Sequence, residues 1–164
     1  MKTSAALLAA LLPAVAAAQP PVEVSFGDLA KFADLKVSVM SSARDREALA
    51  ADLKRHIERE APVRLPPGTR LKVHVRDVDM AGEYWPIAGG AATRDMRIIK
   101  DVYPPRIDLD FQLLRADGSV ERSGRRELRD GGFLMGAGPM STEPLRYEKD
   151  LLDGWLRREF APAR

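Results

Sequence analysis

Acidic residues between positions 77 and 101 are the clearest candidates for chemistry in this sequence. Asp77 and Asp79 lie two residues apart in an expected strand, so their carboxylates would point to the same face and could share a hard cation. The run that begins at Asp77 starts like a calcium-binding loop, but alanine occupies one ligand position (Ala81) and the twelfth position (Ala88). The hypothetical metal ligands are Asp77, Asp79, Glu83 and Asp101.

The alternative role of these carboxylates is structural. Aspartates often cap turns or pair with arginine, and the chain offers Arg76, Arg97 and Arg106 as partners. Two carboxylates about 5–10 Å apart across a cleft could also hydrolyse a glycosidic bond, but no pattern marks such a pair or raises the pKa of one member. We favour the structural role and expect no cofactor. A carboxylate-based metal-binding or glycan-cleaving enzyme remains the alternative function.

The sequence lacks the residues and motifs that other common catalytic mechanisms require. The chain has no cysteine, which excludes a disulfide scaffold, a cysteine-ligated zinc and a thiol nucleophile. His56 and His74 form no H-E-x-x-H motif, and no G-x-S-x-G sequence is present. We expect both histidines to be ordinary surface or boundary residues. The glycine-rich residues 131–138 lack the context of a phosphate-binding loop, so we expect a flexible loop there.

Aromatic and basic residues gather in the long segment 80–106. Aromatic side chains beside cations make good recognition surfaces, because they bury a large area at a low cost in conformational entropy. The alternative is that the aromatics plug the open end of a sheet, and both uses stay open at this point. The candidate binding residues are Tyr84, Trp85, Arg97, Lys100, Tyr103 and Arg106.

Hydrophobic periodicity predicts four strands that would position these residues. Alternating apolar residues indicate strands at 22–26, 71–75 and 107–113, and a fourth strand at 120–128 follows the hairpin signal Asp117-Gly118. The arginines of the fourth strand fit a charged edge strand. At Asp77 the alternation changes phase, so either the strand ends there or a β-bulge resets it. Residues 80–105 are expected to form a long loop in which residues 96–99 add a short strand.

Two helices complete the expected fold. Ser42 and Asp45 have the spacing of a capping box, the first helix carries an apolar stripe, and Pro62 ends it. Thr142 and Pro144 are expected to open the second helix. The order strand, helix, three strands, helix predicts an α+β fold. Its two layers would be an approximately four-stranded, mostly antiparallel sheet and two helices on one face.

The first 18 residues have the pattern of a secretory signal peptide. Lys2 precedes the apolar residues 5–12, and small residues at 16–18 precede Gln19. The apolar run is shorter than the roughly 20 residues that span a bilayer. We therefore expect residues 1–18 to be removed and residues 19–164 to form one periplasmic or secreted domain without a transmembrane segment.

The composition of the remaining chain limits its partners. Removing 18 of the 164 residues leaves 146, which suits a single domain. Because residues 1–18 carry Lys2 as their sole charged side chain, the formal net charge falls from +2 to +1. A nucleic-acid partner usually requires a clearly basic surface, so we expect none.

Four stretches carry a resemblance to a known family. They are VEVSF at 22–26, DVDMAGE at 77–83, DMRIIKDVYPPRI at 95–107, and LRYEK at 145–149 with the following Leu151, Leu152 and Trp155. Together they resemble domain-of-unknown-function family 3016, whose members are small exported bacterial proteins. The resemblance implies export and a single domain, and it implies no activity, cofactor or site residue.

These observations lead to one main expectation about function. The protein is expected to be a non-enzymatic binding or envelope-associated module whose segment 80–106 recognises an envelope protein or an anionic glycan. A structural subunit that assembles through its edge strand is a third possibility.

Overall fold

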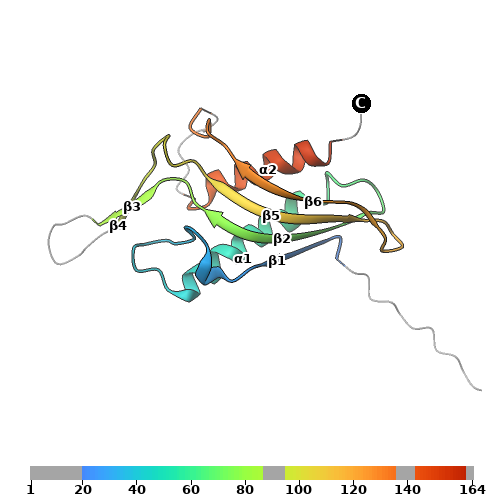
Figure 1. Cartoon of the computed structure of the whole chain (residues 1–164), viewed down its shortest axis with the longest axis horizontal. Coiled ribbons are helices and arrows are strands. Elements are labelled where there is room, and N and C mark those ends of the chain that lie inside the picture. The colour runs from blue at the N-terminus through green and yellow to red at the C-terminus, as the bar shows by residue number, and fades with distance from the viewer. Residues whose placement is uncertain (1–19, 87–94, 136–142, 162–164) are drawn as a thin grey trace, which may run out of the picture.

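Four strands build the main sheet and carry the core (Figure 1). The computed structural model describes residues 20–86, 95–135 and 143–161. The strands are β1 (Val22–Phe26), β2 (Arg70–Asp79), β5 (Arg106–Leu114) and β6 (Val120–Arg129), in the spatial order β1-β2-β5-β6. β2, β5 and β6 pair antiparallel, whereas β1 is parallel to β2. The sheet is therefore mixed, because the helical connection between β1 and β2 returns the chain in the same direction.

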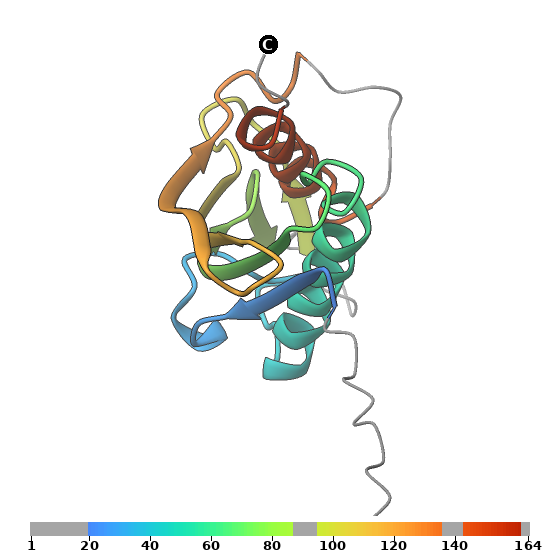
Figure 2. The same ribbon diagram turned by 90° about the vertical axis from the view of Figure 1, so that its right-hand side faces the viewer.

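Two helices, α1 (Ala43–Glu60) and α2 (Arg146–Glu159), cover one face of this sheet (Figure 2). Inward-facing residues of the strands and the apolar stripes of both helices form one core cluster. At its centre Phe111 and Trp155 contact edge to face, with ring centroids 6.0 Å apart. The opposite face of the sheet is polar, and neither of the described helices covers it. The arrangement confirms the predicted α+β fold with two helices on one face.

Local sequence signals explain how the helices begin. In α1 the Ser42 hydroxyl accepts a hydrogen bond from the Asp45 amide at 3.2 Å, and the Asp45 carboxylate accepts one from the Ser42 amide at 2.8 Å. This is the predicted capping box. The first turn of α2 has no side-chain cap, and its N-cap is Leu145. Thr142, which was expected to open this helix, lies outside the described residues.

Removing the capping hydroxyl should measurably weaken the fold. We expect Ser42→Ala to lower the free energy of unfolding by about 1 kcal/mol, because one helix N–H loses its acceptor. Chemical denaturation measures this change, with Ser123→Ala on the exposed side of β6 as the control. Equal stability of the two variants would contradict the role of the cap.

Charged and polar side chains join α1 to α2 where the two helices pack against each other. His56 is 5% exposed, and its Nε2 lies 3.0 Å from Asp153 Oδ1 of α2. Lys149 donates a hydrogen bond to Asp52 at 2.8 Å across the same interface. The expectation that both histidines lie at the surface or boundary is therefore wrong for His56, which is buried between α1 and α2.

A β-bulge in β2 explains the phase change that the sequence shows. Val75 pairs with Leu109 and Asp77 with Asp108, so Arg76 is the extra residue. Beyond the bulge Val78 and Met80 take the inward positions and are 0% and 2% exposed. The end of β2 thus stays attached to the core while its aspartates lie on the outer side.

Part of the long segment after β2 forms a second, two-stranded sheet. β3 (Glu83–Pro86) pairs antiparallel with β4 (Asp95–Ile98). We call this ribbon the arm, and Figure 1 shows it projecting beyond the end of the main sheet. The short strand expected at 96–99 is present, but its partner β3 was not predicted. Residues 87–94 between the strands lie outside the described residues.

The expected signal peptide and the glycine-rich segment include residues that the structure does not describe. The proposed signal peptide, residues 1–18, lies outside the described residues. In the glycine-rich segment, residues 131–135 form turns, and residues 136–138 are not described. No helix in the described part of the chain has the length and apolar character needed to cross a membrane.

Candidate functional site

Large apolar side chains are exposed on and beside the arm. Trp85 and Met96 are direct cross-strand neighbours and are 50% and 54% exposed. In the turn that follows β4, Val102 and Tyr103 are 66% and 42% exposed. We call these four residues the arm surface. Several large apolar side chains exposed along one segment are typical of interaction sites.

Two polar neighbours, Glu83 and Lys100, contact the Trp85 ring of the arm surface. The Trp85 indole N–H donates a hydrogen bond to Glu83 Oε2 at 3.1 Å. The Lys100 ammonium lies 5.3 Å from the Trp85 ring centroid, within the range of a cation–π contact. These contacts restrict the ring before any partner binds, which lowers the entropy that binding must remove.

Arg97, one of the predicted binding residues, lies on the inner side of the arm. Its side chain is 12% exposed, and its guanidinium lies 4.9 Å from the centroid of the Tyr84 ring. Tyr84, the cross-strand neighbour of Arg97, is half-buried. Of the predicted binding residues, Trp85, Lys100, Tyr103 and Arg106 are exposed, while Tyr84 and Arg97 are partly buried.

Buried polar groups fasten the arm to the domain. Arg97 Nε donates to the Ala81 carbonyl at 2.5 Å, and Arg97 Nη2 donates to Asp34 Oδ2 at 3.5 Å. The Ala81 amide donates to Glu148 Oε1 of α2 at 2.7 Å. We call Asp34, Ala81, Arg97 and Glu148 the root cluster. It joins the segment before α1, the start of the arm, β4 and α2.

Burial dominates the electrostatics of the root cluster. Glu148 is 1% exposed, and its Oε2 has no hydrogen-bond partner among the described residues. Burial raises the pKa of Glu148 to about 7, although the Ala81 amide and Arg97 both favour its charged form. Burial also raises the pKa of Asp34, against the attraction of Arg97. The root cluster therefore contains one carboxyl group, that of Glu148, whose pKa lies near neutral pH.

A raised carboxyl pKa alone does not make a general acid for glycan cleavage. The acid must reach the leaving oxygen of the sugar. At 1% exposure Glu148 is shielded from any group of that size. Its position fits control of packing at the root of the arm.

Three of the four hypothetical metal ligands have other neighbours in this structure. Asp77 Oδ1 accepts hydrogen bonds from the Ala33 amide at 2.7 Å and the Val78 amide at 2.9 Å. Asp79 pairs across the sheet with Arg106, and Glu83 accepts from Trp85. Asp101 is exposed in the turn after β4. Among the described residues, no group of three or more histidine, aspartate or glutamate side chains is placed to hold a metal ion.

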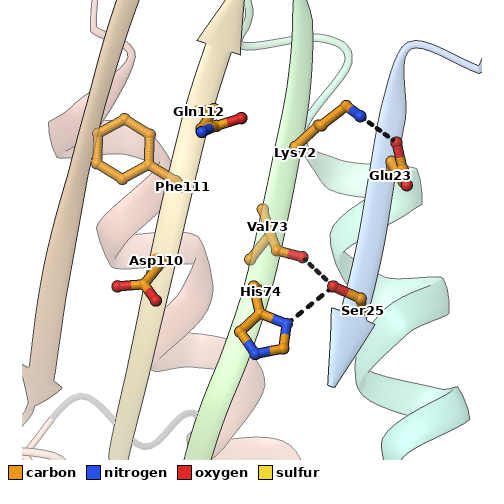
Figure 3. Close-up of a pocket in the computed structure, with 8 residues that line it drawn as sticks. All are labelled: Glu23, Ser25, Lys72, Val73, His74, Asp110, Phe111 and Gln112. Atoms are coloured by element: carbon orange, nitrogen blue, oxygen red, sulfur yellow. Dashed lines mark hydrogen bonds and ion pairs between the residues drawn. The ribbon is translucent and has the colours of Figure 1, made fainter. Parts of the chain in front are cut away.

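The uncovered face of the sheet has a shallow hollow (Figure 3). It contains a row of Ser25, His74 and Asp110 on adjacent strands, the residue types of a hydrolytic triad. The Ser25 hydroxyl lies 3.0 Å from His74 Nδ1, but Asp110 accepts its hydrogen bond from Arg76 at 3.2 Å. No hydrogen bond joins Asp110 to His74 in the described part of the chain, so the triad is incomplete.

Both edges of the main sheet are protected from further pairing. Lys54 of α1 donates a hydrogen bond to the Val24 carbonyl of β1 at 3.3 Å. On β6, Arg126 donates to the Arg125 carbonyl at 2.9 Å and also pairs with Glu159 of α2. Cationic side chains on edge strands are a common protection against edge-to-edge association. The geometry therefore gives no support to assembly through an edge strand.

Glu148 is the site residue that the sequence analysis missed. It lies three residues before Leu151 and four before Leu152, so its helical position belongs to the apolar stripe of α2. A carboxylate in an apolar stripe is the signal that could have marked it as a buried group.

Comparison with known proteins identifies a family and no activity. A family model described as "Protein of unknown function (DUF3016)" matches residues 20–158. The comparisons with curated proteins and with solved structures found no match.

Proposed function

We propose a function from the geometry, because the chain belongs to the family described as Protein of unknown function (DUF3016), a description that names no activity. The protein is an exported, non-enzymatic module that binds a protein of the cell envelope through its arm surface. Export rests on the signal-like pattern of residues 1–18. The binding role rests on the arm.

The observation that carries the proposal is the exposed pair of Trp85 and Met96. Tryptophan dominates the binding energy of many interfaces when a partner desolvates it, and methionine adapts to irregular apolar surfaces. The two residues are cross-strand neighbours on a ribbon that projects from the domain (Figure 1). A partner can therefore contact them without displacing any part of the core.

The surroundings of Trp85 favour a protein over an anionic glycan. The Lys100 ammonium is directed at the Trp85 ring, and Glu83 lies beside the indole N–H. An anionic ligand would have to compete for the lysine and approach the glutamate. Met96 and Val102 offer sugar hydroxyls no hydrogen-bond partner, but they match an apolar protein surface.

The test compares binding by two double variants of the immobilised protein. We expect Trp85→Ala/Tyr103→Ala to reduce at least tenfold the amount of a specific envelope protein retained from detergent-solubilised envelope, because hot-spot aromatics commonly contribute 2 kcal/mol or more. The control is Val63→Ala/Val120→Ala. Those valines are 82% and 50% exposed, and they lie at the opposite end of the sheet from the arm.

The controls separate the possible outcomes. Retention should survive high salt and vanish after protease treatment of the extract. Retention that protease spares and salt abolishes would indicate an anionic glycan instead. Equal retention by both double variants would overturn the proposed role of the arm surface.

A further inference from the structure

We propose that a single proton fastens the arm to the domain: neutral Glu148 holds the root cluster closed, and loss of its proton loosens the arm. The proposal concerns attachment of the arm and does not depend on what the arm binds. Its basis is the position of Glu148 at the junction of α2, the start of the arm and β4.

The contact made by Glu148 acts directly on the arm. Its Oε1 accepts from the Ala81 amide at 2.7 Å, while the Ala81 carbonyl accepts from Arg97 of β4 at 2.5 Å. One peptide segment thus links helix α2 to the second strand of the arm. Gly82, the next residue, donates from its amide to the Tyr103 carbonyl at 2.9 Å and closes the base of the ribbon.

Among the described residues, two charged side chains act on the Glu148 carboxyl. From β4 the facing group is Arg97, and from the segment before α1 it is Asp34. Lys36 and Asp79 act on Asp34 and form the next layer. The neutral groups that act on the Glu148 carboxylate are the Ala81 amide and the amide of Glu148 itself.

The proton decides whether these buried charges balance. With Glu148 neutral, Arg97 and Asp34 form a balanced pair, each 12% exposed. With Glu148 ionised, one buried cation faces two anions, and Glu148 Oε2 lacks a donor. An under-compensated buried charge is costly. Admitting water lowers that cost, and water enters by separating α2 from the Ala81 segment.

Linkage gives the expected size of the effect. A glutamate with an ordinary pKa of 4.5 when opened and about 7 when closed makes the opening equilibrium about tenfold more favourable at pH 8 than at pH 6. If the arm binds a partner as proposed, affinity should weaken over the same range. That consequence rests on the proposed function, whereas the test below uses no partner.

The experiment measures amide hydrogen exchange by NMR at pH 6, 7 and 8 on the full chain. The protection factor of the Ala81 amide, corrected for intrinsic exchange, should fall about tenfold from pH 6 to pH 8 in the wild-type protein. In Glu148→Gln it should stay constant. The matched control Asp150→Asn changes an exposed carboxylate of the same helix and should behave like the wild type.

Two results would overturn the proposal. One is a wild-type protection factor that does not change with pH. The other is an equal fall in Glu148→Gln. If Glu148→Gln fails to fold, the Glu148 carboxyl carbon can be titrated by NMR in the wild-type protein. The backbone NMR signals of β3 and β4 should then change with pH at the same midpoint as the Glu148 carboxyl carbon. Backbone signals of the arm that do not change at that midpoint would equally refute the proposal.

Discussion

At pH 8.5 the Glu148→Gln variant is expected to be about 3 kcal/mol more stable than the wild-type protein, and the difference should shrink to less than about 1 kcal/mol at pH 5. The native pKa of Glu148 is about 7 and its ordinary value is 4.5. Between these values the native state holds a proton that the unfolded chain has lost. The contribution of Glu148 is therefore fully present below pH 4.5 and is lost as the pH rises through 7.

The variant isolates this one group. The side-chain oxygen of glutamine accepts the Ala81 hydrogen bond and never ionises. Burial also raises the pKa values of Asp34 and Asp79, and both proteins share these groups. Urea denaturation at pH 5, 7 and 8.5 measures the difference. Parallel stability curves for variant and wild type would contradict the assignment.

Gly82→Ala is expected to lower the free energy of unfolding by roughly 2–4 kcal/mol. Gly82 has a φ of +79°, a backbone conformation that alanine adopts at a cost. A Cβ atom there would lie 2.5 Å from the Ile98 carbonyl oxygen and 2.8 Å from Ile99 Cδ1. Both contacts are too short, so β4 must move away from the end of β2.

Gly68 offers a matched control for this substitution. Its φ is +76°, and a Cβ atom added there would meet nothing within 4 Å. Gly68→Ala should therefore cost about 1 kcal/mol from backbone conformation alone. Chemical denaturation of both variants separates the two costs. An equal loss of unfolding free energy in the two variants would contradict the steric cost expected from moving β4 away from Gly82.

Much of the main sheet was predictable because its signals are local. Alternation marks β1, β2 and β5, and the Asp117-Gly118 turn places β6 beside β5. The capping box of Ser42 and Asp45 fixes the start of α1. The phase change at Asp77 left two alternatives, and the bulge at Arg76 decides between them.

The arm and its root were harder to predict, since both depend on contacts between distant parts of the chain. β3 has four residues without regular apolar alternation, and its pairing with β4 spans the intervening residues 87–94. Arg97 looks like a surface residue because its burial depends on Asp34, which lies 63 positions away. Glu148 meets Ala81 across 67 positions. Composition and spacing identified Trp85 and Tyr103, but they could not show which aromatic faces solvent.

Site-specific photo-crosslinking in intact cells tests the role of the arm surface most directly. A photoreactive phenylalanine analogue placed at Trp85 should yield a discrete crosslinked envelope protein, and the same analogue at Val63 should yield none. Both positions are solvent-exposed, so reactivity alone does not distinguish them. A crosslinked protein captured from position 63 and absent from position 85 would contradict the account.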